Sequence, residues 1–267
     1  MRGLPTGESF ACMSNRQSTW EQTGAASGLF AVLLFVAAFI VFLNTDPGGG
    51  NTPRLPNIAH AVAAPAFFAD HLNGIRAQVM LNSIGIVFFL WFLGTLWRVL
   101  RGAEGGPARG SSIASAGALV GVALTLVGLM LTGTATLTTS SAQAQTVPTL
   151  YTAAALSFAF GGAAFTIFFL GVAEVTLRAG GLPKWVGWLA ILAAVLSVFG
   201  FVTPYAPQGV FNPATGGLGF YAHWAAFVVW LLVASTVLGL AQHRRKRVSA
   251  AAIAVQGAHP AAEGARP

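Results

Sequence analysis

Residues 67–101 read FFADHLNGIRAQVMLNSIGIVFFLWFLGTLWRVLR, and this stretch decides the class of the protein. It begins with an acid, a histidine and an arginine close together, and an uncharged, mainly apolar run then follows as far as Trp97. An apolar helix of about 20 residues is long enough to cross the hydrocarbon core of a bilayer. The stretch therefore predicts a transmembrane helix preceded by a short polar segment.

The whole chain has the composition of a membrane protein. Of its 267 residues, 55% are hydrophobic and only 8% are charged, whereas soluble domains carry about 25% charged residues. The net charge of +7 does not indicate nucleic-acid binding, because the basic residues lie in short clusters beside apolar runs, where they orient membrane helices. Cys12 is the only cysteine, which excludes an internal disulfide and a cysteine-based metal cluster.

Six stretches are long and apolar enough to span a bilayer, so the predicted fold is all-α, an integral membrane bundle of six transmembrane helices. The predicted spans are 25–43, 78–97, 112–132, 150–177, 184–203 and 218–241. They divide the chain into an N-terminal segment (1–24), a six-helix transmembrane domain (25–241) and a basic tail (242–267). Residues 248–267 of this tail are poor in large apolar residues, and we expect them to be disordered.

The distribution of positive charge predicts the orientation. If six spans alternate, all lysines and arginines except Arg54 and Arg76 fall on one side of the membrane. Because cytoplasmic loops are enriched in basic residues, both termini are predicted to be cytoplasmic. A basic cluster directly after the last span is also expected to attract anionic lipid: Arg244, Arg245, Lys246 and Arg247.

An amphipathic helix is predicted on the outer face, before the second span. Its apolar residues recur at helical spacing: Phe68, Leu72, Ile75 and Val79. Its polar residues fall on the opposite side: Asp70, Asn73 and Arg76. Such a helix is expected to rest at the lipid boundary, which explains these charges without catalysis.

The ends of the predicted spans carry capping signals. Ser111 and Ser112 can cap the third span. Gly180 and Gly181 stop the fourth span, and Pro183 starts the fifth. One side of the third span consists of small residues and predicts a closely packed neighbour, with the lining of a substrate path as the alternative: Gly117, Gly121, Thr125, Gly128 and Thr132.

Two strings of sequence carry a resemblance to other proteins. AFFADHLNGIRAQVMLNSIGIVFFLWFLGTLWRVLRGAEGG and the later LPKWVGWLAIL resemble a group of uncharacterised polytopic membrane proteins common in actinobacteria. Those proteins pair an outer A-[FY]-[AR]-D-[HN] segment with an F-L-W-F-L span, an Arg-rich E-G turn and an L-P-[KR]-W motif before the fifth span. The resemblance covers residues 60–200. It implies six spans and a bacterial plasma membrane, and it implies no activity.

The chain has no motif that predicts enzymatic chemistry. Phosphate-loop, H-E-x-x-H and G-x-S-x-G patterns in a suitable context are missing, so no catalytic residue and no cofactor are predicted. Glu174 lies near the end of the fourth span, and Arg178 follows it by one helical turn. The depth of Glu174 places it at the interface. A surface ion pair with Arg178 is therefore favoured over a proton or cation relay.

Four residues on the predicted outer side are candidate metal ligands: His60, Asp70, His71 and His223. Zinc binds such nitrogen and oxygen donors. However, no two of these histidines lie three or four residues apart on one helix, so no metal is predicted.

The predicted function is a non-enzymatic, multi-pass membrane protein of unassigned role. One alternative is a small-molecule transporter or permease, which needs a polar path that includes residues such as Asn82, Thr125 and Glu174. A second alternative is an intramembrane metal-dependent hydrolase, which needs the outer histidines to meet. A cavity that crosses the bundle would favour transport.

Overall fold

The computed structural model describes residues 7–45, 64–139, 144–202, 205 and 218–257. In these parts of the chain all regular structure is helical: α1 Gly7–Thr45, α2 Ala64–Asp70, α3 Leu72–Glu104, α4 Arg109–Thr138, the 3-10 turn η2 Ala144–Thr146, α5 Val147–Arg178, α6 Lys184–Val202 and α7 Leu218–Gly257. Six of these helices are long and apolar enough to cross a membrane. The predicted all-α fold with six spans is therefore confirmed.

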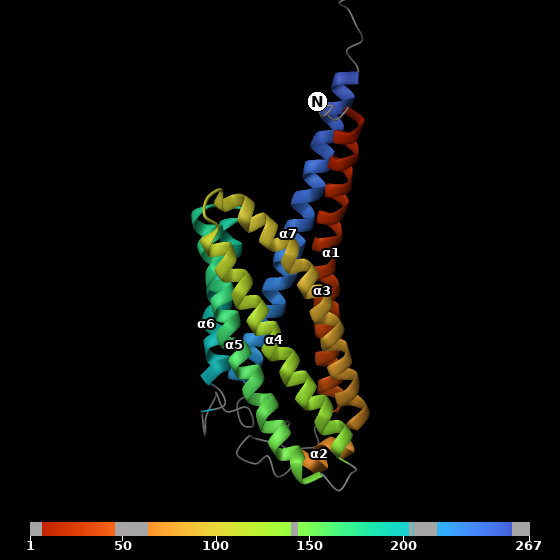
Figure 1. Cartoon of the computed structure of the whole chain (residues 1–267), viewed down its shortest axis with the longest axis vertical. Coiled ribbons are helices and arrows are strands. Elements are labelled where there is room, and N and C mark those ends of the chain that lie inside the picture. The colour runs from red at the N-terminus through yellow and green to blue at the C-terminus, as the bar shows by residue number, and fades with distance from the viewer. Residues whose placement is uncertain (1–6, 46–63, 140–143, 203–204, 206–217, 258–267) are drawn as a thin grey trace, which may run out of the picture.

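The six long helices pack as a closed ring, in which each helix contacts the next. Along the chain α3 packs on α1, α4 on α3, α5 on α4, α6 on α5 and α7 on α6, and α7 returns to pack on α1. The start of α1 and the end of α7 lie at the same end of the ring, and α2 lies at the opposite end (Figure 1). We call the first the basic end, because basic residues flank its helix termini: Arg98, Arg101, Arg109, Arg178, Lys184 and Arg244. The other is called the α2 end.

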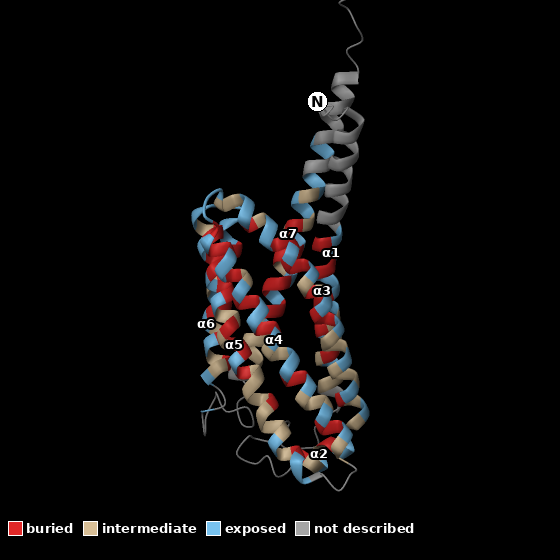
Figure 2. Cartoon of the chain, viewed as in Figure 1, coloured by how far each residue is buried: buried red, intermediate tan, exposed pale blue. Residues whose placement is uncertain are grey.

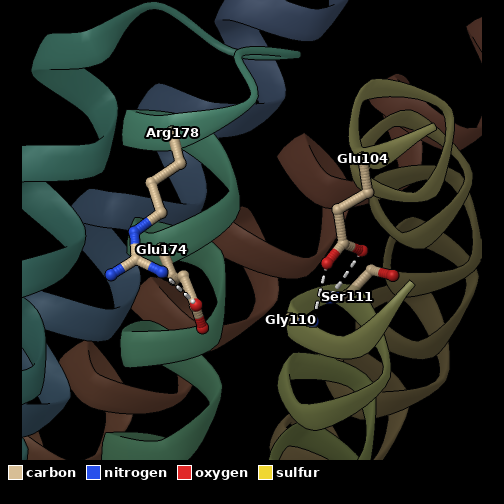
Figure 3. Close-up of polar contacts among 5 residues, drawn as sticks. All are labelled: Glu104, Gly110, Ser111, Glu174 and Arg178. Carbon is tan, nitrogen blue, oxygen red and sulfur yellow. Dashed lines mark hydrogen bonds and ion pairs between the residues drawn. The ribbon is translucent and has the colours of Figure 1, made fainter. Parts of the chain in front are cut away.

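A carboxylate closes the turn between α3 and α4 at the basic end. Glu104 is the last residue of α3, and its carboxylate accepts hydrogen bonds from the backbone nitrogens of Gly110 (2.7 Å) and Ser111 (3.1 Å) (Figure 3). These are donors of the first turn of α4, which would otherwise lack partners inside the helix. Glu104 therefore caps α4, and its negative charge also complements the helix dipole.

The predicted caps of this helix are corrected. Ser111 and Ser112 lie inside α4, and both hydroxyls donate to the carbonyl of Ala108, at 3.3 and 2.7 Å. The helix begins earlier than predicted because Ala108, with φ 24°, reverses the chain just before Arg109. The turn brings the carboxylate of Glu104 to the position that a serine cap would occupy.

The turn between α5 and α6 follows the predicted pattern. Gly180 and Gly181 have φ of 91° and 85°, a backbone conformation that favours glycine. The nitrogen of Gly180 donates to the carbonyl of Val175 at 3.1 Å and closes the last turn of α5. Pro183 immediately precedes α6. The glycine stop and the proline start are both confirmed.

The side of α4 that carries small residues, such as Gly117, packs closely on α5. A Cβ atom on Gly117 would lie 2.6 Å from the backbone nitrogen of Phe168, and one on Gly171 would lie 2.7 Å from the nitrogen of Ala114. Backbones approach this closely only where side chains are absent. The close neighbour predicted for this span is therefore α5.

The amphipathic segment before the second span is helical, as predicted, but it differs from the prediction in two respects. The chain turns at His71 between the short α2 and the start of α3, so the segment is not one continuous helix. Its apolar side faces protein, because Phe68 (2% exposed) and Ile75 pack with Ala135 and Val147 at the ends of α4 and α5. The lipid boundary is therefore not where this stripe rests.

Arg76, on the polar side of the same segment, contacts the end of α4. It donates from its Nη2 atom to the carbonyl of Thr136 at 3.4 Å, where the helix dipole favours a cation.

The last helix extends further than the sequence predicts. α7 continues as a helix to Gly257, into the segment for which the sequence predicts disorder. Residues 258–267 lie outside the described residues.

Candidate functional site

The interior of the ring differs between its two halves. Buried residues, red in Figure 2, are more frequent toward the basic end than near α2. The large, fully buried side chains of the chain include six of this region: Phe92, Leu96, Phe168, Phe169, Trp230 and Leu231. The Phe168 and Phe169 rings contact Trp230 with centroids 5.3 and 5.4 Å apart, both nearly edge to face. Such pairs add attraction beyond the area that they bury. We call this region the packed half.

The half toward the α2 end contains a cavity of about 240 Å³. Every one of α1 to α7 contributes to its lining. Most of the large lining side chains are aromatic: Phe35, Phe39, Phe42, Phe67, Phe68, Phe89, Tyr151, Phe158, Phe165, Tyr221, Trp224 and Phe227. An apolar, concave pocket with a few convergent polar groups is the usual form of a small-molecule site. This region is called the hollow half.

On α5 the lining of the cavity combines small and aromatic side chains. Ala154, Ala155, Ala159 and Gly162 lie there among Tyr151, Phe158 and Phe165. The small residues leave space beside the helix, and the rings provide apolar wall around it.

Three aromatic rings form the floor of the cavity near the middle of the bundle. The deepest lining residues of α3, α5 and α7 are Phe89, Phe165 and Phe227. Their centroids lie 5.1 Å apart for Phe89 and Phe227, 5.0 Å for Phe165 and Phe227, and 6.4 Å for Phe89 and Phe165. The floor continues into the packed half through Phe168, whose ring contacts Phe89 at 6.4 Å.

Polar side chains lie between the aromatic residues of the wall, and several of them donate to their own helix. The hydroxyls of Thr125, Thr132 and Ser197 each donate to a backbone carbonyl one turn earlier, at 2.8 Å. The Nδ2 atom of Asn82 donates to the carbonyl of Gln78 at 2.9 Å. The hydroxyl protons of Thr125, Thr132 and Ser197 are therefore engaged, and their oxygens keep lone pairs that can accept a hydrogen bond. Asn82 keeps its carbonyl oxygen and one amide proton.

The residues needed for a polar path do not share one site. Asn82 and Thr125 line the cavity, but Glu174 lies at the basic end. There the Oε1 atom of Glu174 accepts from Nη1 of Arg178 at 3.0 Å, and the two side chains are 46% and 79% exposed (Figure 3). Glu174 and Arg178 therefore form an exposed ion pair one helical turn apart, and such pairs contribute little to the free energy of unfolding.

The candidate metal ligands occupy different surroundings. Asp70 is exposed, and His71 donates from Nδ1 to the carbonyl of Phe67 at 2.9 Å, with its ring 4.7 Å from the Phe67 ring. His223 lines the cavity and lies against Gly200 of α6. Within the described residues no group of three His, Cys, Asp or Glu side chains could hold a metal. His60 lies outside those residues, so the absence of a metal stays a prediction.

Sequence reasoning did not identify most of the cavity lining. Gln78, Tyr151, Ser197 and Tyr221 were not candidates, although all four line the cavity. A signal was present at 153–164, where eight of the twelve residues are alanine or glycine. This composition by itself cannot show whether the neighbouring helices fill the space beside these residues.

No family model matches the chain, and no curated protein and no solved structure shows a significant match to it. The resemblance to the actinobacterial membrane proteins is therefore supported only in its six candidate spans.

Proposed function

We propose that this chain is a non-enzymatic, multi-pass membrane protein that binds a lipophilic small molecule in its hollow half. The cavity of about 240 Å³ with aromatic walls is the observation that carries this proposal. Its volume is slightly below the range of about 300–1,000 Å³ that is typical of ligand pockets, which favours a small ligand. The cavity also extends from the α2 end only to the middle of the bundle, which matches the depth of a molecule held in one membrane leaflet.

Binding is favoured over transport because of the floor. A path across the membrane would require Phe89, Phe165 and Phe227 to separate, together with the packed rings of Phe168 and Trp230 behind them. Closely packed interiors of this kind resist rearrangement. Catalysis is less favoured, because the described lining residues include no aspartate, glutamate or lysine, and His223 is the one histidine among them.

Photolabelling tests the binding proposal directly. The protein, in lipid nanodiscs, is exposed to a medium-chain alcohol that carries a diazirine, and the labelled residues are identified by mass spectrometry. We expect labels on cavity-lining residues such as Phe158, and we expect Ala155→Phe to abolish them because the new ring occupies the cavity. Leu170→Phe is the matched control, since Leu170 lies on the same helix with a side chain that is 51% exposed.

The contrary result is equally clear. If the label falls evenly on exposed apolar residues and Ala155→Phe changes nothing, the hollow half does not bind lipophiles. The proposed function then fails, whatever the chemical class of the ligand.

The arrangement in the membrane is part of the proposal. The basic end is placed in the cytoplasm of a bacterial cell and the α2 end outside, which is supported by the charge distribution. With Cys12 replaced by alanine, Asn73→Cys should react with an impermeant maleimide in intact cells, and Gly106→Cys should react only after permeabilisation. Both positions are exposed. Reversed labelling would invert the orientation.

The lipid contacts follow from the same arrangement. Four basic residues at the end of α7 are proposed to attract anionic lipid: Arg244, Arg245, Lys246 and Arg247. Each basic residue near an anionic surface contributes about 1 kcal/mol, and the effect is screened by salt. Replacing all four by glutamine should reduce the retention of anionic lipid by the purified protein.

A further inference from the structure

We infer that the ligand of the hollow half is a neutral lipophile that carries a hydroxyl group, with the hydroxyl donating to oxygen atoms of Asn82 and Thr125. This inference rests on the proposed function and specifies the chemical class of the ligand. It depends on two properties of the wall: the absence of acidic and strongly basic side chains among its described residues, and the hydrogen-bonding groups that its polar side chains still offer.

The first property excludes a charged ligand. The described residues that line the cavity include no aspartate, glutamate, lysine or arginine. A carboxylate, phosphate or ammonium group placed there would lose its hydration without gaining a counter-ion, and that loss is far larger than the gain from a neutral hydrogen bond. The ligand is therefore uncharged.

The second property selects a hydroxyl group. Thr125 Oγ1 donates to the carbonyl of Gly121 at 2.8 Å, and Asn82 Nδ2 donates to the carbonyl of Gln78 at 2.9 Å. Thr132 and Ser197 use their hydroxyl protons in the same way. What the three hydroxyls retain is lone pairs, while Asn82 retains its carbonyl oxygen and one amide proton, and Gln78 and Trp224 add N–H donors to the lining. A ligand hydroxyl suits such a wall, because it donates to a lone pair and can also accept from an N–H group, while the rest of the ligand stays apolar.

The depth of these groups also orients the ligand. Asn82 and Thr125 lie between the α2 end and the aromatic floor formed by Phe89, Phe165 and Phe227. The apolar body of the ligand fits against the floor and the alanine side of α5, and its hydroxyl lies against α3 and α4. An aliphatic or cyclic alcohol of moderate size meets all these conditions.

Competition for the photolabelled cavity tests the inference. Three competitors share a straight chain of ten carbons: decanol, decyl methyl ether and decanoate, whose tenth carbon is that of the carboxylate. Decanol donates a hydrogen bond, the ether can only accept one, and decanoate is charged. We expect decanol to compete roughly fivefold better than the ether, which is the effect of one neutral hydrogen bond. We expect decanoate to be at least about tenfold weaker than decanol.

Substitutions in the cavity wall test whether Asn82 and Thr125 cause the preference for decanol over the ether. Thr125→Val combined with Asn82→Leu removes two acceptors with little change in volume, and should reduce the advantage of decanol over the ether to less than about twofold. Thr134→Val is the matched control, because Thr134 makes the same type of bond, to the carbonyl of Met130 at 2.9 Å, on the exposed side of α4. The control should retain the full preference.

The outcomes separate this inference from the proposed function. If the ether or decanoate competes as well as decanol while labelling still falls in the cavity, binding stands and the inferred ligand class is wrong. If the preference persists in the double variant, the assigned acceptors are wrong. If the cavity is not labelled at all, the proposed function fails and the inference fails with it.

Discussion

The two halves of the ring are built from the same six long helices, but the interior is filled by side chains in one half and contains a cavity in the other. In the packed half α5 places Phe168 and Phe169 against Trp230 of α7, and all three are fully buried. In the hollow half the same helix supplies Ala155, Ala159 and Gly162, together with the rings of Tyr151, Phe158 and Phe165, to the wall of a cavity. The difference shows that aromatic side chains of one helix can fill the interior of a bundle at one level and surround open space at another.

The two halves also differ in what an unfilled interior costs in free energy. An empty cavity destabilises a protein by about 24 cal/mol per Å³ in the best-studied series, so a cavity of about 240 Å³ would cost on the order of several kcal/mol if nothing filled it. A ligand or lipid chain that occupies the hollow half recovers part of this free energy. The packed half has no such dependence on a ligand.

The largest expected difference between the halves is the response to removing one ring. Phe168 and Phe158 lie on the same helix, but Phe168 is fully buried in the packed half and Phe158 lines the cavity. We expect Phe168→Ala to lower the free energy of unfolding by about 3–5 kcal/mol, the range for buried phenylalanine. Phe158→Ala should cost less than half as much. Denaturant titration in one detergent measures both, and equal losses would remove the distinction between the halves.

A smaller loss of stability is expected from adding a methyl group where two helix backbones lie close together. Gly117→Ala places a methyl group 2.6 Å from the Phe168 nitrogen, and we expect a loss of about 1–3 kcal/mol because α4 and α5 must separate. Gly133, on the same helix, has its nearest neighbour 3.8 Å away, on Val79. Gly133→Ala should therefore be neutral or slightly stabilising in the same titration. A loss at Gly133 as large as that at Gly117 would contradict the close packing assigned to α4 and α5.

The smallest of these effects concerns the turn that closes the basic end. Glu104→Gln removes the charge that accepts from Gly110 and Ser111, and we expect a loss of about 1 kcal/mol, as for other helix caps. Glu174→Gln breaks only the exposed pair with Arg178, for which a smaller loss is expected. Thermal unfolding of both variants at low and high salt makes the comparison. A larger loss for Glu174→Gln would reverse the roles assigned to the two carboxylates.

The number of spans and the glycine and proline turns could be predicted because they depend on local properties. Length and hydropathy define each span, and Gly180, Gly181 and Pro183 act on the backbone next to them. The cap of α4 was predicted wrongly, because the prediction considered only residues next to the start of the helix. Serine is the usual local cap, whereas Glu104 reaches the start of α4 only after Ala108 reverses the chain.

The cavity could not be predicted, because it depends on what several helices fail to fill together. Asn82 and Thr125 were identified as polar residues inside spans, and they do line it. Glu174 was grouped with them, but the order of residues along a span does not show which helices meet. The burial of Phe68 shows the same limitation, since its periodicity indicates an apolar side without specifying whether lipid or the ends of α4 and α5 cover it.

The most direct test of the hollow half is to enlarge one alanine in each half of α5 and to measure the free energy of unfolding. Ala155 lines the cavity, whereas Ala173 is buried within the packed core. We predict that Ala155→Leu leaves stability unchanged or raises it, because the added carbons enter existing space, and that Ala173→Leu lowers it by about 1–3 kcal/mol through overpacking. Equal destabilisation by the two substitutions would show that the hollow half is filled by protein and would contradict the account.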